Sequence, residues 1–350
     1  MEISEDLLNK LKSKKSVKIL AIESSCDETS VAVVENGRNV LSNVIASQID
    51  IHTRFGGVVP EIASRNHITA ISNVTRQALD QANCTLDDID AFAVTYGAGL
   101  LGALLVGISF AKGLAYMKNL PLIAVSHIKG HIAANYLTHE DLRPPFVCLL
   151  VSGGHTAILD VVDYTHIKVI GTTIDDAVGE AFDKVARVIG LGYPGGPKID
   201  KIAKQGNANI EFRHHNTMAN SNNFSFSGIK TAVINYVHKC EQNNEKIKQE
   251  DIAASFQKVV TDELANKAIK VTKNLQRNQL VIAGGVGANS ELQNKLGVLC
   301  KENNIKLYFP SLKLCTDNAA MIGSYAYYQL LDNGEVTDLD LTASSVVPLE

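Results

Sequence analysis

The sequence predicts an α/β protein made of a duplicated unit. Three consecutive β-rich segments occur near the start of the chain, and three more occur after residue 145. Each set is followed by helical patterns that alternate with further apolar strands. The segment 143–145, Arg-Pro-Pro, lies between the two sets and is the clearest linker signal. Because alternating strands and helices form layered α/β domains, we expect two lobes of similar architecture with a ligand cleft between them.

The first half of the chain fits this plan element by element. Asn36-Gly37, between two β-rich segments, is a strong signal for a two-residue hairpin turn. Pro60 suits the first turn of a helix that extends to about Gln81. The expected elements are strands at 17–23, 30–35, 39–47, 90–96 and 121–126, and helices at 60–81, about 100–118 and 127–137.

The second half repeats the order of three strands followed by helices and strands. Asp251 is a plausible N-cap for a long helix. The expected elements are strands at 146–152, 156–162, 166–173, 278–284 and 306–310, and helices at about 176–189, 227–240, 251–277, 317–331 and one starting near 290. The division that we expect is a polar leader at 1–16, lobe one at 17–130 plus about 318–350, and lobe two at 131–317.

Composition limits the class of protein. The 350 residues carry a formal net charge of −4 and are 45% apolar, which describes a globular chain and argues against a broad nucleic-acid coat. The six cysteines form no CxxC pair, as expected in a reducing compartment. The N-terminus has no apolar secretory core, and the most apolar stretch, 100–117, is interrupted by glycines and a lysine. We expect no membrane association and a cytoplasmic location, with the mitochondrial matrix as the alternative.

Three loops are rich in small residues: 23–30, 151–156 and 283–290. The first two lie at the same place in each half, between the first and second strands. Glycine and serine turns let backbone N–H groups approach an anion, and a helix N-terminus adds a favourable dipole. These loops are therefore candidate phosphate- and nucleoside-binding loops, and simple tight turns are the alternative. None is followed by the GK[ST] of a Walker A motif.

His127 and His131 are spaced i, i+4 on an expected helix and so share one face. Two imidazoles so placed can bind one metal ion, and Asp317 is a candidate third ligand that suits Zn or Fe. A polar helix face without metal is the alternative. A zinc-protease helix would need glutamate directly after the first histidine, where this chain has Ile128, so peptide hydrolysis is disfavoured.

Long motifs across residues 17–325 resemble one known family. They are ILAIESSCDETS, GGVVPEIASRNH, HIKGHIAA, LLVSGGHT, GEAFDKVAR, GLGYPGGPKID, FSFSGIKTAV, GGVGANS and CTDNAAMIG. The chain resembles the bacterial-type tRNA N6-adenosine threonylcarbamoyltransferases, the TsaD family, formerly described as O-sialoglycoprotein endopeptidases. The resemblance implies a two-lobed, actin-like ATPase fold (ASKHA, a duplicated RNase H-like unit) with an interlobe cleft.

The resemblance also implies an activity. The family transfers threonylcarbamoyl from threonylcarbamoyl-AMP to the N6 amine of the adenosine immediately 3′ of the anticodon, in tRNAs reading ANN codons, and releases AMP. It implies one divalent metal ion per subunit, Fe or Zn, and leaves open Mg with ATP. The implied partners are tRNA, a paralogous actin-like protein and a small P-loop ATPase, and a homodimer is open. The alternative functions are an actin-fold small-molecule kinase or ATPase, a scaffold without chemistry and, last, a metalloprotease.

The resemblance assigns roles to residues of this sequence. The implied metal ligands are His127, His131 and Asp317. The catalytic carboxylates that we expect are Asp27 and Glu28, with Glu28 positioning or deprotonating the adenine amine, and a solvated turn is the alternative. The implied adenylate-binding residues are Leu150, Val151, Ser152, Gly153, Gly154, Asp183, Gly196, Asp200 and Asn289. For tRNA, Lys267, Lys270, Lys273 and Arg277 form a candidate basic stripe, and a solvated helix face is the alternative.

Overall fold

The computed structural model describes residues 5–212, 218, 220–332, 334 and 336–349. The chain forms two compact units. Unit 1 comprises residues 1–144, 163–166 and 310–350, and unit 2 comprises residues 145–162 and 167–309. These bounds differ from the expected lobes at 131–144, 163–166 and 310–317. The first difference arises because the helix that carries His127 and His131 is continuous and packs within unit 1.

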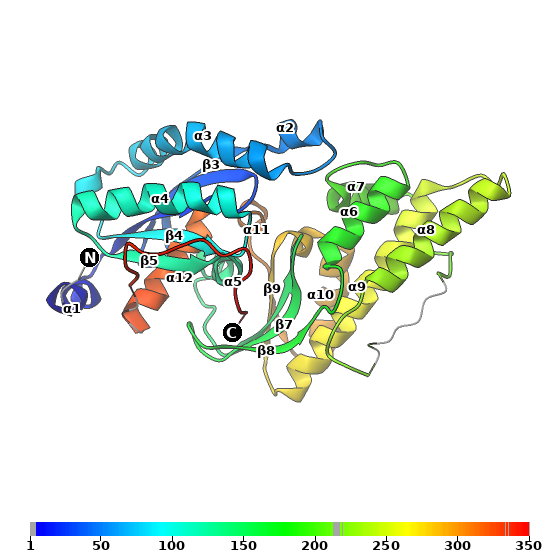
Figure 1. The fold of residues 1–350 in the computed structure, drawn as a ribbon. Helices are drawn as coiled ribbons and strands as arrows, with labels where there is room; N and C mark the ends of the chain where they lie inside the picture. Colours follow the sequence, from blue (N-terminus) through cyan, green and yellow to red (C-terminus); the bar gives the residue numbers. More distant parts are fainter. Residues whose placement is uncertain (1–4, 213–217, 219, 333, 335, 350) are drawn as a thin grey trace. The chain divides into compact units, whose positions relative to one another are not determined.

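Unit 1 is a five-stranded mixed sheet covered by helices (Figure 1). The strand order is β3-β2-β1-β4-β5, with β1, β2 and β3 antiparallel and β4 and β5 parallel to β1. Its main elements are α1 (Glu5–Ser13), β1 (Lys18–Glu23), β2 (Glu28–Glu35), β3 (Asn39–Ser47), α2 (Ile49–Thr53), α3 (Pro60–Gln81), β4 (Ala91–Gly97), α4 (Leu101–Lys118), β5 (Leu122–Ser126), α5 (His127–Thr138), α11 (Leu312–Cys315) and α12 (Ala319–Asp332).

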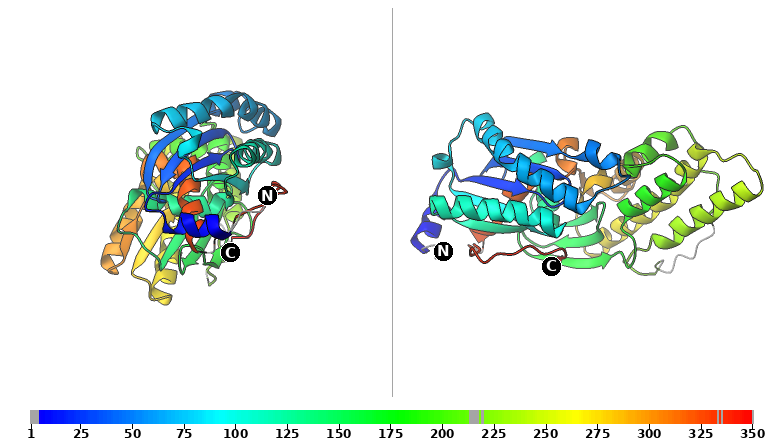
Figure 2. Two further views of the ribbon diagram at one scale, coloured as in Figure 1. Left: turned by 90° about the vertical axis from the view of Figure 1, so that its left-hand side faces the viewer. Right: turned by 45° about the horizontal axis from the view of Figure 1, so that its top comes forward.

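Helices cover both faces of this sheet. Figures 1 and 2 show α3 and α4 over one face, where Leu20 and Ile22 of β1 join their core cluster. Ala21, between them, faces Gly323 of α12 on the other side. The strand therefore alternates between two apolar layers, as expected for a strand buried on both faces.

The predicted hairpin is present between β2 and β3. Asn36 and Gly37 both have positive φ, 51° and 67°. A Cβ on Gly37 would lie 2.6 Å from the ring of Tyr327, so both the turn and the packing require glycine here.

Unit 2 repeats the same topology. Its strand order is β10-β9-β6-β7-β8, with β6, β7 and β8 antiparallel and β9 and β10 parallel to β6. Its main elements are β6 (Phe146–Val151), β7 (Thr156–Val161), β8 (Ile167–Thr172), α6 (Val178–Val188), α7 (Gly195–Ala203), α8 (Ser227–Gln242), α9 (Gln249–Asn274), β9 (Gln279–Ala283), α10 (Ser290–Glu302) and β10 (Lys306–Tyr308). The matching order confirms the predicted duplicated α/β plan.

Some details differ from the sequence-based expectations. The leader contains helix α1, which buries Leu11, and helix α7 was not expected. Helix α9 begins at Gln249, so Asp251 lies inside it and instead accepts the backbone N–H of Asn207. The last helix begins at Ala319, which leaves Asp317 in the short segment before it.

Helix α4 is the one described helix long and apolar enough, by length and composition alone, to cross a membrane. Core helices of globular proteins pass the same test. Leu104, Ile108 and Ala111 of α4 are buried within the core cluster of unit 1, which fits such a core helix.

A candidate metal centre and a candidate anion loop

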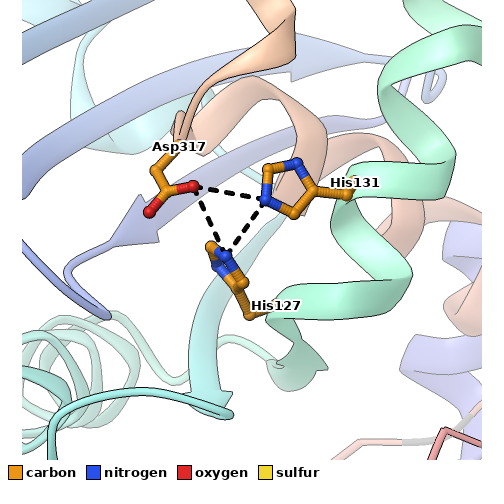
Figure 3. A group of neighbouring side chains, drawn as sticks. All are labelled: His127, His131 and Asp317. Atoms are coloured by element: carbon orange, nitrogen blue, oxygen red, sulfur yellow. Dashed lines mark hydrogen bonds and ion pairs between the residues drawn. The ribbon is translucent and has the colours of Figure 1, made fainter. Parts of the chain in front are cut away.

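Two histidines and an aspartate of unit 1 converge on one point (Figure 3). Helix α5 begins at His127, directly after β5, so His131 lies one turn later on the same face. The two Nε2 atoms are 3.1 Å apart. Oδ1 of Asp317 lies 3.4 Å from Nε2 of His127 and 3.2 Å from Nε2 of His131. The structure therefore brings together the three predicted ligands.

The donor set fits a divalent transition metal. Ligands about 2.1 Å from a tetrahedral metal are about 3.4 Å from one another, and the three observed separations are close to that value. Two imidazoles and one carboxylate suit Zn or non-haem Fe, with positions left open for a substrate. Ile128, the residue after His127, is buried and apolar, so the helix carries no glutamate base of the protease type.

The charges around the triad reinforce one another. Burial opposes the charged form of His127, but Asp317 and Glu23 outweigh it and raise the pKa of His127 well above its usual value. Burial likewise disfavours a charged Asp317, yet His127 and His131 hold the pKa of Asp317 well below its usual range. The metal-free site is therefore a compact ion-pair network, and a metal ion would replace its protons.

The predicted carboxylates Asp27 and Glu28 lie near this triad in unit 1. Burial, then the charges of Asp27 and Asp317, raise the pKa of Glu28 to about 9. Glu28 also accepts a hydrogen bond from the hydroxyl of Ser47 at 3.0 Å. Asp27 is buried, and its carbonyl oxygen accepts the backbone N–H of Gln48. The carboxyl of Glu28 and the backbone of Asp27 are thus held by β3 and the residue after it.

Sequence reasoning missed two residues that support His127 and the segment carrying Asp27 and Glu28. Glu23 at the end of β1 contacts His127, and His67 on α3 contacts Cys26 and Thr29 at the two ends of that segment. The available signal was a glutamate at the end of an apolar strand, but its partner His127, at the start of α5, could not be inferred from local pattern.

A second group of potential ligands in the described part of the chain consists of Asp163, His166 and Asp332. Asp163 and His166 are half or more exposed. Oδ1 of Asp163 also accepts the backbone N–H groups of Thr165 and His166, which closes the turn. We attribute this group to turn stabilisation.

In unit 2 the loop 152–155 joins β6 to β7 as a tight turn. The N–H of Ser152 donates to the carbonyl of His155, and the N–H of His155 donates to Oγ of Ser152. A Cβ on Gly153 or Gly154 would meet nothing within 4 Å, so a ligand can approach this backbone. Leu150 and Val151 are fully buried strand residues, so only their backbone is available to a ligand.

The other glycine-rich segments of unit 2 pack around this turn. A Cβ on Gly179 of α6 would lie 2.6 Å from the carbonyl oxygen of Ser152. A Cβ on Gly284, after β9, would lie 2.5 Å from the carbonyl oxygen of Val151. Two predicted loops therefore meet at the carboxyl ends of β6 and β9, where α/β folds commonly bind ligands.

The remaining predicted adenylate residues make specific contacts. Asp183 accepts the N–H of Gly195 at 2.6 Å, and burial raises its pKa. Asp200 accepts from the N–H and hydroxyl of Ser290. Asn289 caps α10 by accepting the N–H of Leu292, and its Nδ2 donates to Oε1 of Gln257. A Cβ on Gly196 would meet nothing within 4 Å.

The basic stripe predicted on α9 is not a continuous surface. Lys267 is buried, and its ammonium donates to the carbonyl oxygens of Met218 and Asn223 and pairs with Glu263. Arg277 pairs with Asp160 at 2.9 Å. Lys273 also donates to Oδ1 of Asn303 at 2.9 Å. Three of the four cations thus have structural partners, which removes the regular spacing on which the prediction rested.

Comparisons with known proteins identify close relatives. A family model described as TsaD, tRNA N6-adenosine threonylcarbamoyltransferase, matches residues 39–324. A protein of that name from Clostridium perfringens (strain 13 / Type A) is 60% identical over 326 residues, 93% of this chain and 96% of the relative. Another of that name, from Clostridium botulinum (strain Kyoto / Type A2), is 58% identical over 331 residues, 94% of this chain and 97% of the relative.

Two solved structures share the fold at low identity. Full-length HypF in a phosphate- and nucleotide-bound form has a TM-score of 0.61 at 14% identity, over 90% of this chain and 46% of that one. Component A of the (R)-2-hydroxyglutaryl-CoA dehydratase of Acidaminococcus fermentans has a TM-score of 0.54 at 12% identity, over 90% of this chain and 99% of that one. Together with the duplicated sheets, these similarities confirm the predicted actin-like fold class.

Proposed function

The chain belongs to the tRNA N6-adenosine threonylcarbamoyltransferase family, and from this premise we propose the donor, the metal centre and the roles of individual residues. The chain is a transferase of tRNA modification. The donor that we propose is threonylcarbamoyl-AMP, the acceptor is the N6 amine of the adenosine next to the anticodon, and AMP leaves. The observation that carries the proposal is the convergence of His127, His131 and Asp317.

The metal role rests on that convergence. His127, His131 and Asp317 would hold one divalent ion, Fe or Zn, through two Nε2 atoms and Oδ1. When bound, the ion supplies a Lewis acid that polarises the carbamoyl or phosphate oxygens of the donor. Any Mg ion would enter with ATP rather than at this triad, because Mg prefers oxygen ligands.

The adenylate role rests on unit 2. Gly153 and Gly154 would present backbone N–H groups to the phosphate of the donor, because their exposed surface lacks side chains. The carboxylates of Asp183 and Asp200 would accept ribose hydroxyls with the lone pairs that their present donors leave available. Asn289 and Gly196 would border the nucleoside through their backbone.

The transfer step needs orientation more than acid catalysis. The leaving group is a phosphate, so it departs without strong protonation. The adenine amine is a weak nucleophile, so holding it against the carbamoyl carbon supplies much of the rate. Asp27 and Glu28 would orient this amine, and one of them would take its proton as the new bond forms.

We also propose that the chain acts with partners in the cytoplasm. The resemblance implies a paralogous actin-like protein and a small P-loop ATPase. Apolar side chains are exposed on α3 and α4, among them Ile68 and Leu105, and they offer one surface for a partner or a second copy. Leu105→Asp should weaken such an assembly in sedimentation experiments without changing the metal content.

The test is direct. Purified protein is incubated with threonylcarbamoyl-AMP, unmodified tRNA and the bacterial partner proteins, and digested tRNA is analysed by mass spectrometry for threonylcarbamoyladenosine. His127→Ala and Asp317→Ala should lose both bound metal and product. His238→Ala, a change at an exposed position of α8, is the matched control and should keep both. Full activity of folded, metal-free His127→Ala would refute the metal role.

A further inference from the structure

Glu23 is a buried carboxylate that the proposed transfer step does not use. It ends β1, beside Thr95 of the parallel strand β4, and none of its surface is exposed. Removing a carboxylate from water is unfavourable unless hydrogen bonds replace the lost solvation. The contacts that compensate for its burial therefore indicate what the residue does.

Three donors surround the Glu23 carboxylate. The backbone N–H of Ser25 donates to Oε1 at 2.6 Å, and the hydroxyl of Thr95 donates to Oε2 at 2.6 Å. Nδ1 of His127 lies 3.1 Å from the same Oε2. Two of these contacts fix the carboxylate in place, and the third directs it at the ring of a proposed metal ligand.

This contact defines the orientation and tautomer of His127. Its Nε2 faces Asp317 and His131, so coordination there requires a lone pair on Nε2 and a proton on Nδ1. Glu23 can only accept, so it selects the form with Nδ1–H. The hydroxyl of Ser25 is also 3.1 Å from Nδ1. Its oxygen is neutral and is therefore a weaker acceptor for Nδ1–H than the Glu23 carboxylate.

His131 lacks an equivalent support. Its Nδ1 is buried and has no hydrogen-bond partner among the residues that the structure describes. The ring of His131 is therefore held by its place on α5 and by the contacts of Nε2. Of the two imidazoles, His127 alone has a carboxylate behind it, so its ring orientation depends on that carboxylate.

We propose that Glu23 is a positioning residue that fixes His127 with Nδ1 protonated and Nε2 aimed at Asp317 and His131, an inference that rests on the proposed metal centre. Carboxylates behind metal-bound histidines fix the tautomer and strengthen the ligand. Glu23 also supplies a second negative charge beside that of Asp317, which balances a divalent ion inside a buried site.

The test measures Co(II) binding, which gives a visible spectrum and does not depend on activity. Glu23→Gln keeps the shape of the side chain but replaces one carboxylate oxygen with an amide NH₂. This group faces one of the three donors around Glu23 and cannot accept its hydrogen bond. We expect it to weaken Co(II) binding about 10–100-fold and to change the d–d absorption bands. Ser24→Ala is the matched control, since Ser24 is the adjacent buried residue and its hydroxyl donates to Ala103 instead. It should bind Co(II) as the wild type does.

A second measurement uses the wild type, so that the inference can be tested even if Glu23→Gln does not fold. Histidine ¹⁵N shifts of the zinc-bound protein should show His127 with protonated Nδ1, the signal being assigned by its loss in His127→Ala. Unchanged Co(II) affinity and spectrum in Glu23→Gln, equal losses in both variants, or unprotonated Nδ1 would overturn the inference alone. Failure of the wild type to bind Co(II) or zinc would overturn the metal centre and this inference together.

Discussion

His67 donates its Nε2–H to the carbonyl oxygen of Cys26 over 2.9 Å. A carbonyl only accepts, so Nδ1 must carry the lone pair, and it accepts the hydroxyl of Thr29 at 2.7 Å. His67 thus ties helix α3 to both ends of the segment that carries Asp27 and Glu28. Its ring is fully buried and neutral, because burial lowers the pKa of His67.

Stability should therefore depend on pH through His67. Because the folded pKa is below the unfolded value of about 6.5, the unfolded state takes up a proton first, and the free energy of unfolding falls as pH decreases below about 6.5. His67→Gln should reduce this dependence while costing about 1–3 kcal/mol at pH 8. Urea unfolding between pH 8 and 5 measures both effects. The exposed His238→Ala variant should retain the wild-type slope, and an unchanged slope in His67→Gln would contradict the assignment.

Glu28 predicts the opposite dependence in the metal-free protein. Its folded pKa of about 9 is above the usual carboxyl value, so the native state holds a proton that the unfolded state has lost. This contribution to stability is complete below about pH 4.5 and disappears as pH rises through 9. Glu28→Gln, which mimics the protonated carboxyl, should be increasingly more stable than the wild type between pH 6 and 10 in the presence of chelator.

The same variant separates two catalytic roles of Glu28. If the residue only orients the adenine amine, the amide should retain most of the transfer rate, whereas a base requires the carboxylate. Metal content is the internal control, because Glu28 is not one of the three converging ligands. In the stability test, curves of unfolding free energy against pH that run parallel for the wild type and Glu28→Gln would show that Glu28 is ionised in the folded state.

Local pattern was sufficient where the relevant contacts are short in sequence. The i, i+4 spacing placed His127 and His131 on one helix face, and Asn36-Gly37 marked the turn that the structure contains. The repeated order of strands and helices likewise predicted two matching sheets.

Long-range contacts were not predictable in this way. Glu23 reaches His127 only because β1 lies parallel to β4 and β4 beside β5, and nothing in the local sequence specifies that order. Lys267 has helical spacing with other cations, yet it is buried against the carbonyls of Met218 and Asn223. In both cases the contacts of a charged residue depend on a segment far away in the sequence, and the periodicity of the local sequence does not predict which segment that is.

Asn289 combines two structural contacts that can be separated. Asn289→Ala removes the cap of α10 and leaves Oε1 of Gln257 without its donor, so we expect a loss of about 1–3 kcal/mol in unfolding free energy. Asn289→Asp keeps the cap and loses only the donor, so it should be the milder change. Denaturant unfolding of both variants checks this order, and equal losses would mean that the cap contributes nothing.

Gly179 supports the proposed phosphate loop through close packing rather than through contact with a ligand. A Cβ there would lie 2.6 Å from the carbonyl oxygen of Ser152 and 2.7 Å from the α-carbon of Gly153, both backbone atoms that cannot rotate away. Gly179→Ala must therefore displace the 152–154 turn. We expect about 1–3 kcal/mol lower stability and a loss of transfer rate of about 100-fold.

The matched control is Gly297→Ala on α10, where a Cβ would meet nothing within 4 Å. Alanine favours helix by about 1 kcal/mol over glycine, so this variant should be slightly more stable and fully active. Adenylate affinity of each protein, measured by calorimetry, distinguishes a displaced loop from a general loss of folding. Wild-type affinity in folded Gly179→Ala would show that the 152–154 turn does not hold the phosphate, because the substitution cannot leave that backbone in place.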